Sequence, residues 1–223
     1  MRIITGIYKG RHFEIPRSFK ARPTTDFAKE NIFNVLTRYI DFDGAVALDL
    51  FSGTGSITLE LLSRGCSRVV SVEQDRDHHR FIKQCVESLS PSQGAVVPVR
   101  GDVFRFIRSC KQQFDFVFAD PPYALKELPT IPDLVLGTHP RPLPEGGGGV
   151  LGTHPRPLPE GGGEVLGKGL LKEGGVFVFE HGKTHDFSQH PRFREHRSYG
   201  SVNFSIFTSA EQASGPDSQT DEP

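Results

Sequence analysis

A short apolar run that ends in Asp-Pro-Pro-Tyr constrains the fold more than any other stretch of this chain. Residues 116–119 are all apolar, as in a strand that is buried on both faces in the middle of a parallel sheet. Proline has no N–H for the ladder, so a central strand cannot continue through the prolines that follow. The chain must leave the sheet at Asp120, which Pro121 restricts to an extended backbone. The sequence therefore predicts an α/β sheet with Asp120 at a ligand-binding strand end.

The residues that follow this strand suit the binding of a planar amine. The exocyclic amine of a nucleobase is a weak nucleophile, because its lone pair is delocalised into the ring. The Asp120 carboxylate and the Pro121 carbonyl could accept its two N–H bonds and free the lone pair, while Tyr123 could stack on the ring. The alternative is a Pro-rich turn that Asp120 only caps. We interpret the following as catalytic residues: Asp120, Pro121, Pro122 and Tyr123.

A glycine-rich turn follows the predicted first strand, residues 45–50. It contains Gly53 and Gly55, but Thr58 stands where a dinucleotide fingerprint has its third glycine. A pyrophosphate is therefore less favoured than a cationic amino-acid ligand, which would suit a carboxylate at Asp49 and a closely approaching backbone. A lone Gly-x-Gly is a weak signal by itself. The candidate cofactor-binding residues of this turn are Asp49, Phe51, Ser52, Gly53, Thr54 and Gly55.

Acids also end the next two predicted strands, residues 68–73 and 95–99. Glu73 lies about 20 residues past the glycines, where an acid typically accepts the ribose hydroxyls of a nucleoside. Asp102 is placed to accept the amino group of an adenine, with Val103 beside it. Pro98 predicts that its strand lies at the sheet edge. One such acid can simply be solvated, but four successive strand ends indicate a site: Asp49, Glu73, Asp102 and Asp120.

The first 40 residues are basic, with a net charge of +5, whereas the whole chain carries −1. Residues 2–20 predict a β-hairpin that turns around Lys9 and Gly10, and a helix is expected to start near Thr25. The charges could be no more than the solvated side chains of an edge ribbon. As a group they form a candidate RNA-binding patch: Lys9, Arg11, Arg17, Lys20 and Arg22.

A 15-residue unit occurs twice in the second half of the chain, at 135–149 and 150–164. It is rich in Pro and Gly and has no apolar period, so nothing offsets the entropy of ordering it. We predict a flexible insertion without chemistry, whose His139 and His154 are poor metal ligands. A strand at 176–180 and an antiparallel hairpin over 193–208 are expected to complete the sheet, followed by a disordered acidic tail.

Cysteine spacing and hydropathy limit the remaining classes of protein. The three cysteines have no CxxC spacing, so we expect reduced thiols and no metal site. There is no apolar run long enough to cross a membrane and no signal-peptide pattern at the start. The expectation is a cytoplasmic protein that does not contact membranes.

The whole pattern resembles the class I S-adenosylmethionine-dependent methyltransferases, and more narrowly the RsmD-type enzymes. These methylate the exocyclic N2 of a guanine in small-subunit ribosomal RNA. The resembling stretches cover nearly all of residues 1–125; they are 1–6, 9–11, 22–26, 31–36, 49–55, 72–73, 101–102 and 120–123. The resemblance implies a Rossmann-like, mostly parallel sheet of seven strands with an antiparallel C-terminal strand. Together with the composition, it divides the chain into an RNA-binding extension at 1–25, a methyltransferase domain at 26–208 and a disordered acidic tail at 209–223.

Residue roles also follow from the resemblance. The turn 49–55 would hold the methionine part of S-adenosylmethionine, Glu73 the ribose, and Asp102 with Val103 the adenine. The target guanine would be held by Asp120, Pro121 and Tyr123. The implied partner is ribosomal RNA or an assembling small subunit, and nothing demands more than a monomer. The repeat and the acidic tail depart from the family pattern.

Four other functions remain open. DNA methylation at adenine N6 or cytosine N4 is disfavoured, because no separate target-recognition domain is visible in the 223 residues. Protein glutamine methylation usually has Asn at the position of Asp120. A non-catalytic RNA-binding module is disfavoured by the intact strand-end acids, and a dinucleotide oxidoreductase by the missing third glycine.

Overall fold

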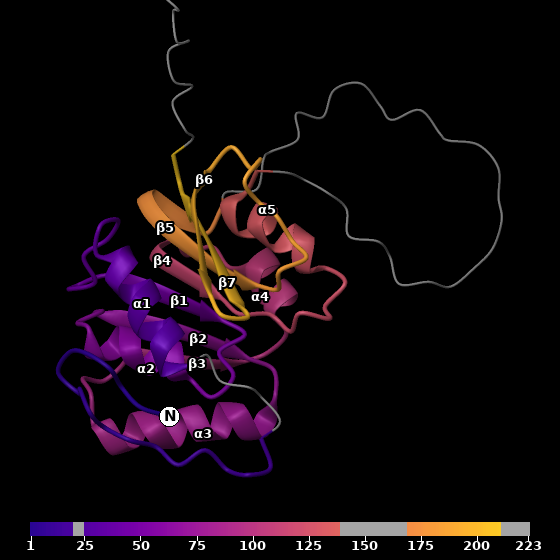
Figure 1. Ribbon diagram of the computed structural model, residues 1–223. Helices are drawn as coiled ribbons and strands as arrows, with labels where there is room; N and C mark the ends of the chain where they lie inside the picture. The colour runs from indigo at the N-terminus through magenta and orange to yellow at the C-terminus, as the bar shows by residue number, and fades with distance from the viewer. Residues whose placement is uncertain (20–24, 139–168, 211–223) are drawn as a thin grey trace, which may run out of the picture.

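The computed structural model describes residues 1–19, 25–138 and 169–210, which form a sheet with helices on both faces (Figure 1). The strand order is β3-β2-β1-β4-β5-β7-β6. In chain order the elements are α1 Asp26–Leu36, β1 Val46–Leu50, α2 Ser56–Ser63, β2 Arg68–Glu73, α3 Arg76–Leu89, β3 Val96–Arg100, α4 Val103–Ser109, β4 Phe114–Ala119, the 3₁₀ helix η1 Leu128–Thr130, α5 Ile131–Leu136, β5 Leu171–His181, β6 Phe193–Tyr199 and β7 Val202–Thr208.

The predicted sheet is confirmed. Strands β1 to β5 pair in parallel, and β7 pairs antiparallel with both β5 and β6. The strand that contains Pro98 is β3, which lies at the edge as predicted. Ala119 is paired with Leu50 on one side and with Phe179 on the other. The carboxyl ends of β1, β4 and β5 therefore meet at one edge.

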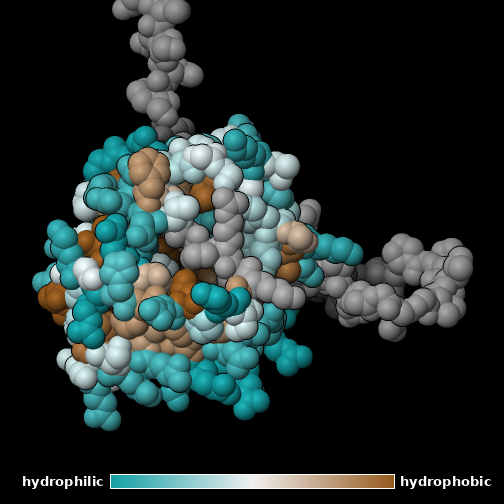
Figure 2. All heavy atoms as spheres, turned by 60° about the horizontal axis from the view of Figure 1, so that its bottom comes forward, coloured by the Kyte–Doolittle hydropathy of each residue, from teal (hydrophilic) through white to brown (hydrophobic). Residues whose placement is uncertain are grey.

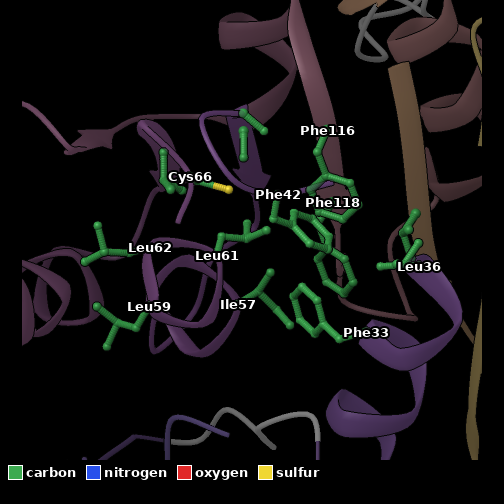
Figure 3. Close-up of a cluster of buried hydrophobic side chains, with 14 of the residues drawn as sticks. Phe33, Leu36, Phe42, Ile57, Leu59, Leu61, Leu62, Cys66, Phe116 and Phe118 are labelled. Carbon is green, nitrogen blue, oxygen red and sulfur yellow. The ribbon is translucent and has the colours of Figure 1, made fainter. Parts of the chain in front are cut away.

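Strand β4 is buried on both faces, which explains its continuous apolar sequence. Phe116 and Phe118 point into the layer formed by α1, α2 and α3, where they lie near Phe33 and Phe42 (Figure 3). The rings of Phe42 and Phe116 are 5.2 Å apart, edge to face. Val117 and its neighbours on the opposite face pack in the layer of α4, η1 and α5. Both layers exclude water from the strand that leads to Asp120.

The predicted N-terminal β-hairpin is present only in part. Arg2 and His12 form an antiparallel bridge, flanked by hydrogen bonds from Ile3 N–H to the Arg11 carbonyl and from Phe13 N–H to the Met1 carbonyl, at 3.0 and 2.9 Å. The pairing is short because the N–H groups of Ile4 and Thr5 donate instead to the two carboxylate oxygens of Glu60, at 2.8 and 3.1 Å. Beyond Ile3 this segment therefore packs on α2.

Glu60 also belongs to a buried ionic network that the sequence pattern did not reveal. Its Oε2 lies 3.7 Å from Nζ of Lys29, and both side chains are at most 1% exposed. Lys29 donates in turn to the carbonyl of Arg2 at 2.6 Å and to Ser56 Oγ at 3.0 Å. On the other side of the carboxylate, Arg64 Nε donates to Oε1 at 2.9 Å. The network joins α1, α2 and the N-terminal segment.

Replacing Glu60 tests this network. Glu60→Ala leaves the Lys29 ammonium buried without its counter-ion, so we expect the free energy of unfolding to fall by about 3–5 kcal/mol. Urea unfolding followed by circular dichroism measures the change. Glu87→Ala, at an exposed position of α3, is the matched control and should change stability by less than about 0.5 kcal/mol. Equal effects of the two substitutions would contradict a structural role for the network.

The start of the repeat lies inside the fold rather than outside it. Val135 and Leu136 are the buried last residues of α5, so the proposed insertion does not begin at 135 as a separate segment. Residues 139–164 lie outside the described part of the chain, and their flexibility stays a prediction. Leu170 N donates to the Val135 carbonyl at 2.7 Å, so the two ends of this region lie side by side. No described helix has the length and apolar character needed to cross a membrane.

Candidate active site

Five neighbouring strands carry an acid at or just past their carboxyl ends. Across the sheet from β3 to β5 these acids are Asp102, Glu73, Asp49, Asp120 and Glu180. The first four are the predicted set, and the structure brings them to one edge. Glu180 was missed as a site residue, although it ends its strand in the same way. Because Ala119 pairs with Phe179, Asp120 and Glu180 follow at adjacent positions.

Burial and mutual repulsion perturb the central carboxyl groups. Asp49 is 1% exposed, and this burial raises its pKa from 3.8 to about 7, although Thr58 Oγ1 donates to its Oδ2 at 2.5 Å. Desolvation also raises the pKa of Asp120, and the nearby carboxyls of Glu180 and Asp49 raise it further. A side-chain hydrogen bond between Asp120 and Glu180 needs one of the two to be protonated. The pair therefore holds a proton at the strand ends.

The side chain of Tyr123 is held by Glu180, the acid at the end of β5. Its hydroxyl donates to Glu180 Oε1 at 2.9 Å, while the residue is 43% exposed. Gly182 packs against the ring, since a Cβ there would lie 3.4 Å from Cδ2 of Tyr123. Pro121 is buried and Pro122 is exposed. The ring is thus fixed at the mouth of the site and remains open for stacking.

The glycine-rich turn is fixed to β2. Ser52 Oγ lies 2.9 Å from the carbonyl oxygen of Asp49 and 3.0 Å from that of Val72, and its single proton is donated to one of them at a time. Gly53 has φ +53° and Gly55 has φ +77°, values that glycine adopts without strain. A Cβ on Gly55 would lie only 2.9 Å from Cγ1 of Ile82. The close packing of this turn on Ile82 therefore requires a residue without a side chain.

Each outer acid already orders the local backbone. Glu73 accepts the N–H groups of Gly53 and Asp75, each at 2.8 Å. Asp102 caps α4 by accepting the N–H of Arg105 at 2.9 Å, and Val103 is buried. Both carboxylates keep further lone pairs for a ligand. These acceptors, which are mostly carboxylates, bind ammonium and hydroxyl groups better than a phosphate.

The predicted basic patch is spread along α3. Arg11 donates to the carbonyl of Ser88 at 3.3 Å, at the carboxyl end of the helix. Phe19 instead contacts His78 in the first turns, with ring centroids 4.3 Å apart. About ten helical residues, or roughly 15 Å, separate these contacts. Lys9 and Arg17 are exposed, whereas Lys20 and Arg22 lie outside the described residues.

The surface over this region is mostly polar. In Figure 2, which brings the bottom of Figure 1 forward, hydrophilic side chains are numerous along the margin of the molecule and a smaller hydrophobic band lies between them.

The described residues contain no group of three or more His, Cys, Asp or Glu that could hold a metal ion.

The raised pKa of Asp49 makes stability depend on pH. Between about pH 4 and pH 7 the folded chain holds a proton on Asp49 that the unfolded chain has lost, so the free energy of unfolding falls as pH rises through this window. Asp49→Asn removes this loss. We expect the free energy of unfolding of Asp49→Asn, minus that of wild type, to increase by about 2–3 kcal/mol from about pH 5 to about pH 8. Urea unfolding measures this difference at each pH.

The control for this measurement is Asp77→Asn. The Asp77 side chain is 67% exposed on α3, so this variant should follow the wild-type pH dependence. If Asp49→Asn also followed it, the carboxyl of Asp49 would have an ordinary pKa and the proposed electrostatics of the site would be wrong.

Comparisons with known proteins agree with this geometry. The family model "Conserved hypothetical protein 95" matches residues 1–138. YlbH of Bacillus subtilis is 36% identical over 138 residues, which are 60% of this chain and 73% of YlbH. "Ribosomal RNA small subunit methyltransferase D" of Haemophilus influenzae is 34% identical over 125 residues, which are 55% of this chain and 64% of that protein.

Solved structures share the fold over more of the chain. The Escherichia coli methyltransferase yhhF superposes with a TM-score of 0.70 at 22% identity, covering 95% of this chain and 99% of its own. RsmC of Thermus thermophilus, a 16S rRNA N2 methyltransferase solved with AdoMet and guanosine, has a TM-score of 0.56 at 16% identity, covering 86% of this chain and 45% of its own. At these identities the likeness establishes the class I methyltransferase fold.

Proposed function

We propose that this chain, which belongs to the RsmD-like methyltransferase family of "Conserved hypothetical protein 95", methylates the exocyclic N2 amine of a guanine in small-subunit ribosomal RNA. The methyl donor in this proposal is S-adenosylmethionine. The observation that carries the proposal is the group formed by Asp120, Glu180 and Tyr123 at the end of β4. It combines two coupled carboxyls with a fixed, exposed aromatic ring. A ribosomal substrate also implies a cytoplasmic location.

The residues at the strand end have distinct roles in this proposal. Tyr123 stacks on an unpaired guanine that has been turned out of its helix. Asp120 and the Pro121 carbonyl accept the two N–H bonds of the amine and direct its lone pair outward. S-adenosylmethionine, when bound, supplies the electrophilic methyl group. A nitrogen–carbon bond forms as the sulfur–carbon bond breaks, and the nitrogen then loses a proton.

The coupled carboxyl pair is suited to receive that proton. Glu180 is 4% exposed and hydrogen-bonded to Tyr123, and its proximity raises the pKa of Asp120. A raised pKa makes the Asp120 carboxylate a stronger base than an ordinary carboxylate, so it takes up that proton more readily. Glu180 therefore has two roles: it orients the stacking ring and it raises the basicity of Asp120.

The other strand ends fit the proposed cofactor. Asp49 would hold the methionine ammonium, Glu73 the ribose hydroxyls, and Asp102 with Val103 the adenine. The residues of the turn from Phe51 to Gly55 would border the methionine part. The chemistry of this carboxylate-rich set, with two glycines in the left-handed conformation, supports these assignments.

A transfer assay with methyl-labelled S-adenosylmethionine tests the function. Small-subunit particles, naked ribosomal RNA and duplex DNA are offered in parallel, and labelled nucleosides are identified afterwards. We expect label in N2-methylguanine from particles or RNA. Label only in DNA would favour a DNA amino methyltransferase, and no label in any substrate, with cofactor still bound, would favour a protein substrate or a binding module.

Asp120→Ala tests the mechanism. Without the carboxylate, the amine loses both an N–H acceptor and a proton acceptor, so we expect kcat to fall by at least about 10²-fold. Affinity for S-adenosylmethionine, measured by calorimetry, should stay within about threefold, because Asp120 does not contact it in this proposal. Asp77→Ala is the matched exposed control. Normal turnover by Asp120→Ala would refute the assigned role.

We propose that the phosphates of the RNA contact the basic patch of Lys9, Arg11, Arg17, Lys20 and Arg22. Phe19 contacts His78 near the N-terminus of α3, the end that follows the carboxyl end of β2. The contact between Arg11 and Ser88 lies at the opposite end. Phe19, two residues after Arg17, therefore lies nearer the site than Arg11 does.

Salt dependence separates the two ends of this patch. Arg17→Ala and Arg22→Ala should each weaken RNA binding and lower the slope of log affinity against log salt by about 1. Arg11→Ala should lower it less, since its guanidinium is held on Ser88. Binding titrations over a range of salt concentrations measure the slopes. Unchanged slopes for both Arg17→Ala and Arg22→Ala would refute the patch.

A further inference from the structure

A cavity lies next to the site, on the opposite face of the end of β5. Its volume is about 400 Å³, and it is lined by the end of β5, the loop 182–188, and the facing parts of β6 and β7. Glu180 points to the face covered by α1, α2 and α3, whereas His181 continues the opposite face of Phe177 and Phe179. Gly182, which packs on Tyr123, starts the loop that covers the cavity. The two sites are thus separated by the end of one strand.

The cavity contains a buried polar group without a partner. Asn203 is paired with His181 in the register of β7 on β5 and is 4% exposed. Its Nδ2 has no hydrogen-bond partner in the part of the chain that the structure describes. Buried amide donors are nearly always satisfied, so the cavity that Asn203 lines is expected to receive an acceptor.

Its neighbours cannot easily supply that acceptor. His181 Nδ1 lies 2.9 Å from the Gly182 carbonyl, which can only accept, so Nδ1 carries the proton. The other nitrogen, Nε2, then accepts from Ser205 Oγ at 2.9 Å. Burial lowers the pKa of His181, which keeps the ring neutral. Within the described residues none of these groups accepts from Asn203 Nδ2, which leaves that amide for a ligand.

The walls combine flat rings with groups of both hydrogen-bonding kinds. His185 is stacked on Phe187 with an interplanar angle of 9°, and the rings of His181 and His196 lie 5.9 Å apart. Asp186 accepts the N–H of Ser188 at 2.9 Å, which lowers the pKa of its carboxyl and keeps it charged. A phosphate could pair with Lys183, which also lines the cavity, but it would share the cavity with the Asp186 carboxylate. A nucleobase instead offers a flat face, acceptors for the Asn203 amide and donors for the carboxylate.

We propose that this cavity binds an unpaired nucleobase of the substrate RNA next to the target guanine. The inference rests on the function proposed above. It accounts for the unpaired amide of Asn203, for the ring-lined walls, and for the position of the cavity immediately beyond Tyr123. The base in the cavity and the target guanine would bind on the two faces of the end of β5. The cavity would therefore help to determine which sequences next to the guanine are accepted.

Removing single bases from an RNA tests the proposal. Once the transfer assay has located the methylated guanine, single-stranded oligonucleotides of about ten nucleotides are made around it. Each carries one abasic residue at a position beside that guanine. Fluorescence anisotropy measures binding to the full chain, so the result does not depend on turnover. For wild type we expect one abasic position to weaken binding about tenfold.

The variants assign that loss to the cavity. Asn203→Ala should weaken binding of the intact oligonucleotide about tenfold, and the abasic residue should then cause no further loss. Asn34→Ala, an exposed position on α1, is the control and should behave as wild type. Thermal unfolding checks that Asn203→Ala folds; if it does not, His196→Ala takes its place and should show the same loss of base sensitivity.

The outcomes separate this inference from the function on which it rests. Methylation of RNA, together with equal base sensitivity in wild type, Asn203→Ala and His196→Ala, would overturn only the cavity. Methylation without any base-sensitive neighbour in wild type would do the same. An absence of methylation in every RNA would overturn both proposals.

Discussion

The parallel register of β1, β4 and β5 is the constraint on which the site depends. Ala119 is paired on both sides, so whatever follows β4 lies between the residues that follow its neighbours. Both faces of these strands are buried, and Pro121 prevents β4 from continuing. Acids at such strand ends lie close to one another with little solvent between them, which raises the pKa values of Asp49 and Asp120. This edge is unfavourable for its own carboxylates and therefore favourable for ligands that bring N–H groups or positive charge.

The same chain buries a carboxylate in a different way at Glu60. There, two backbone N–H groups, the Lys29 ammonium and the Arg64 guanidinium surround the acid. Among the residues that the structure describes, no comparable set of donors surrounds Asp120, which is near two further acids. A buried charge that is fully supplied with partners holds structure together, whereas one that is left among like charges indicates a functional site. The surroundings of Glu60 and Asp120 alone thus distinguish a structural carboxylate from one at a functional site.

The features that the sequence predicted are those whose signal is local. The apolar run before Asp120, the paired glycines and the edge proline each act on their own strand, so the sheet and four of the five strand-end acids followed from them. The ion pair of Lys29 and Glu60 did not, because charged residues in amphipathic helices normally face solvent. The N-terminal hairpin is shorter than predicted for a related reason: the partners of Ile4 and Thr5 are side-chain oxygens more than 50 residues away. Glu180 carried the same strand-end signal as the other acids but stood outside any motif, and the unpaired amide of Asn203 became visible only from the packing of β5 against β7.

Strand β5 relates the two proposed sites to the kind of nucleic acid that can occupy them. Glu180 holds Tyr123 on one face of its end, and the cavity with Asn203 opens on the other face, with Gly182 between them. Two neighbouring bases that bind on opposite sides of one strand end must be unstacked from each other. Consecutive bases of a regular duplex are stacked, and opening two of them costs more than flipping one. Loops, bulges and ends of RNA present such splayed bases without that cost. Together the two proposed sites would thus favour single-stranded RNA over duplex DNA, independently of the residues that would perform the methyl transfer.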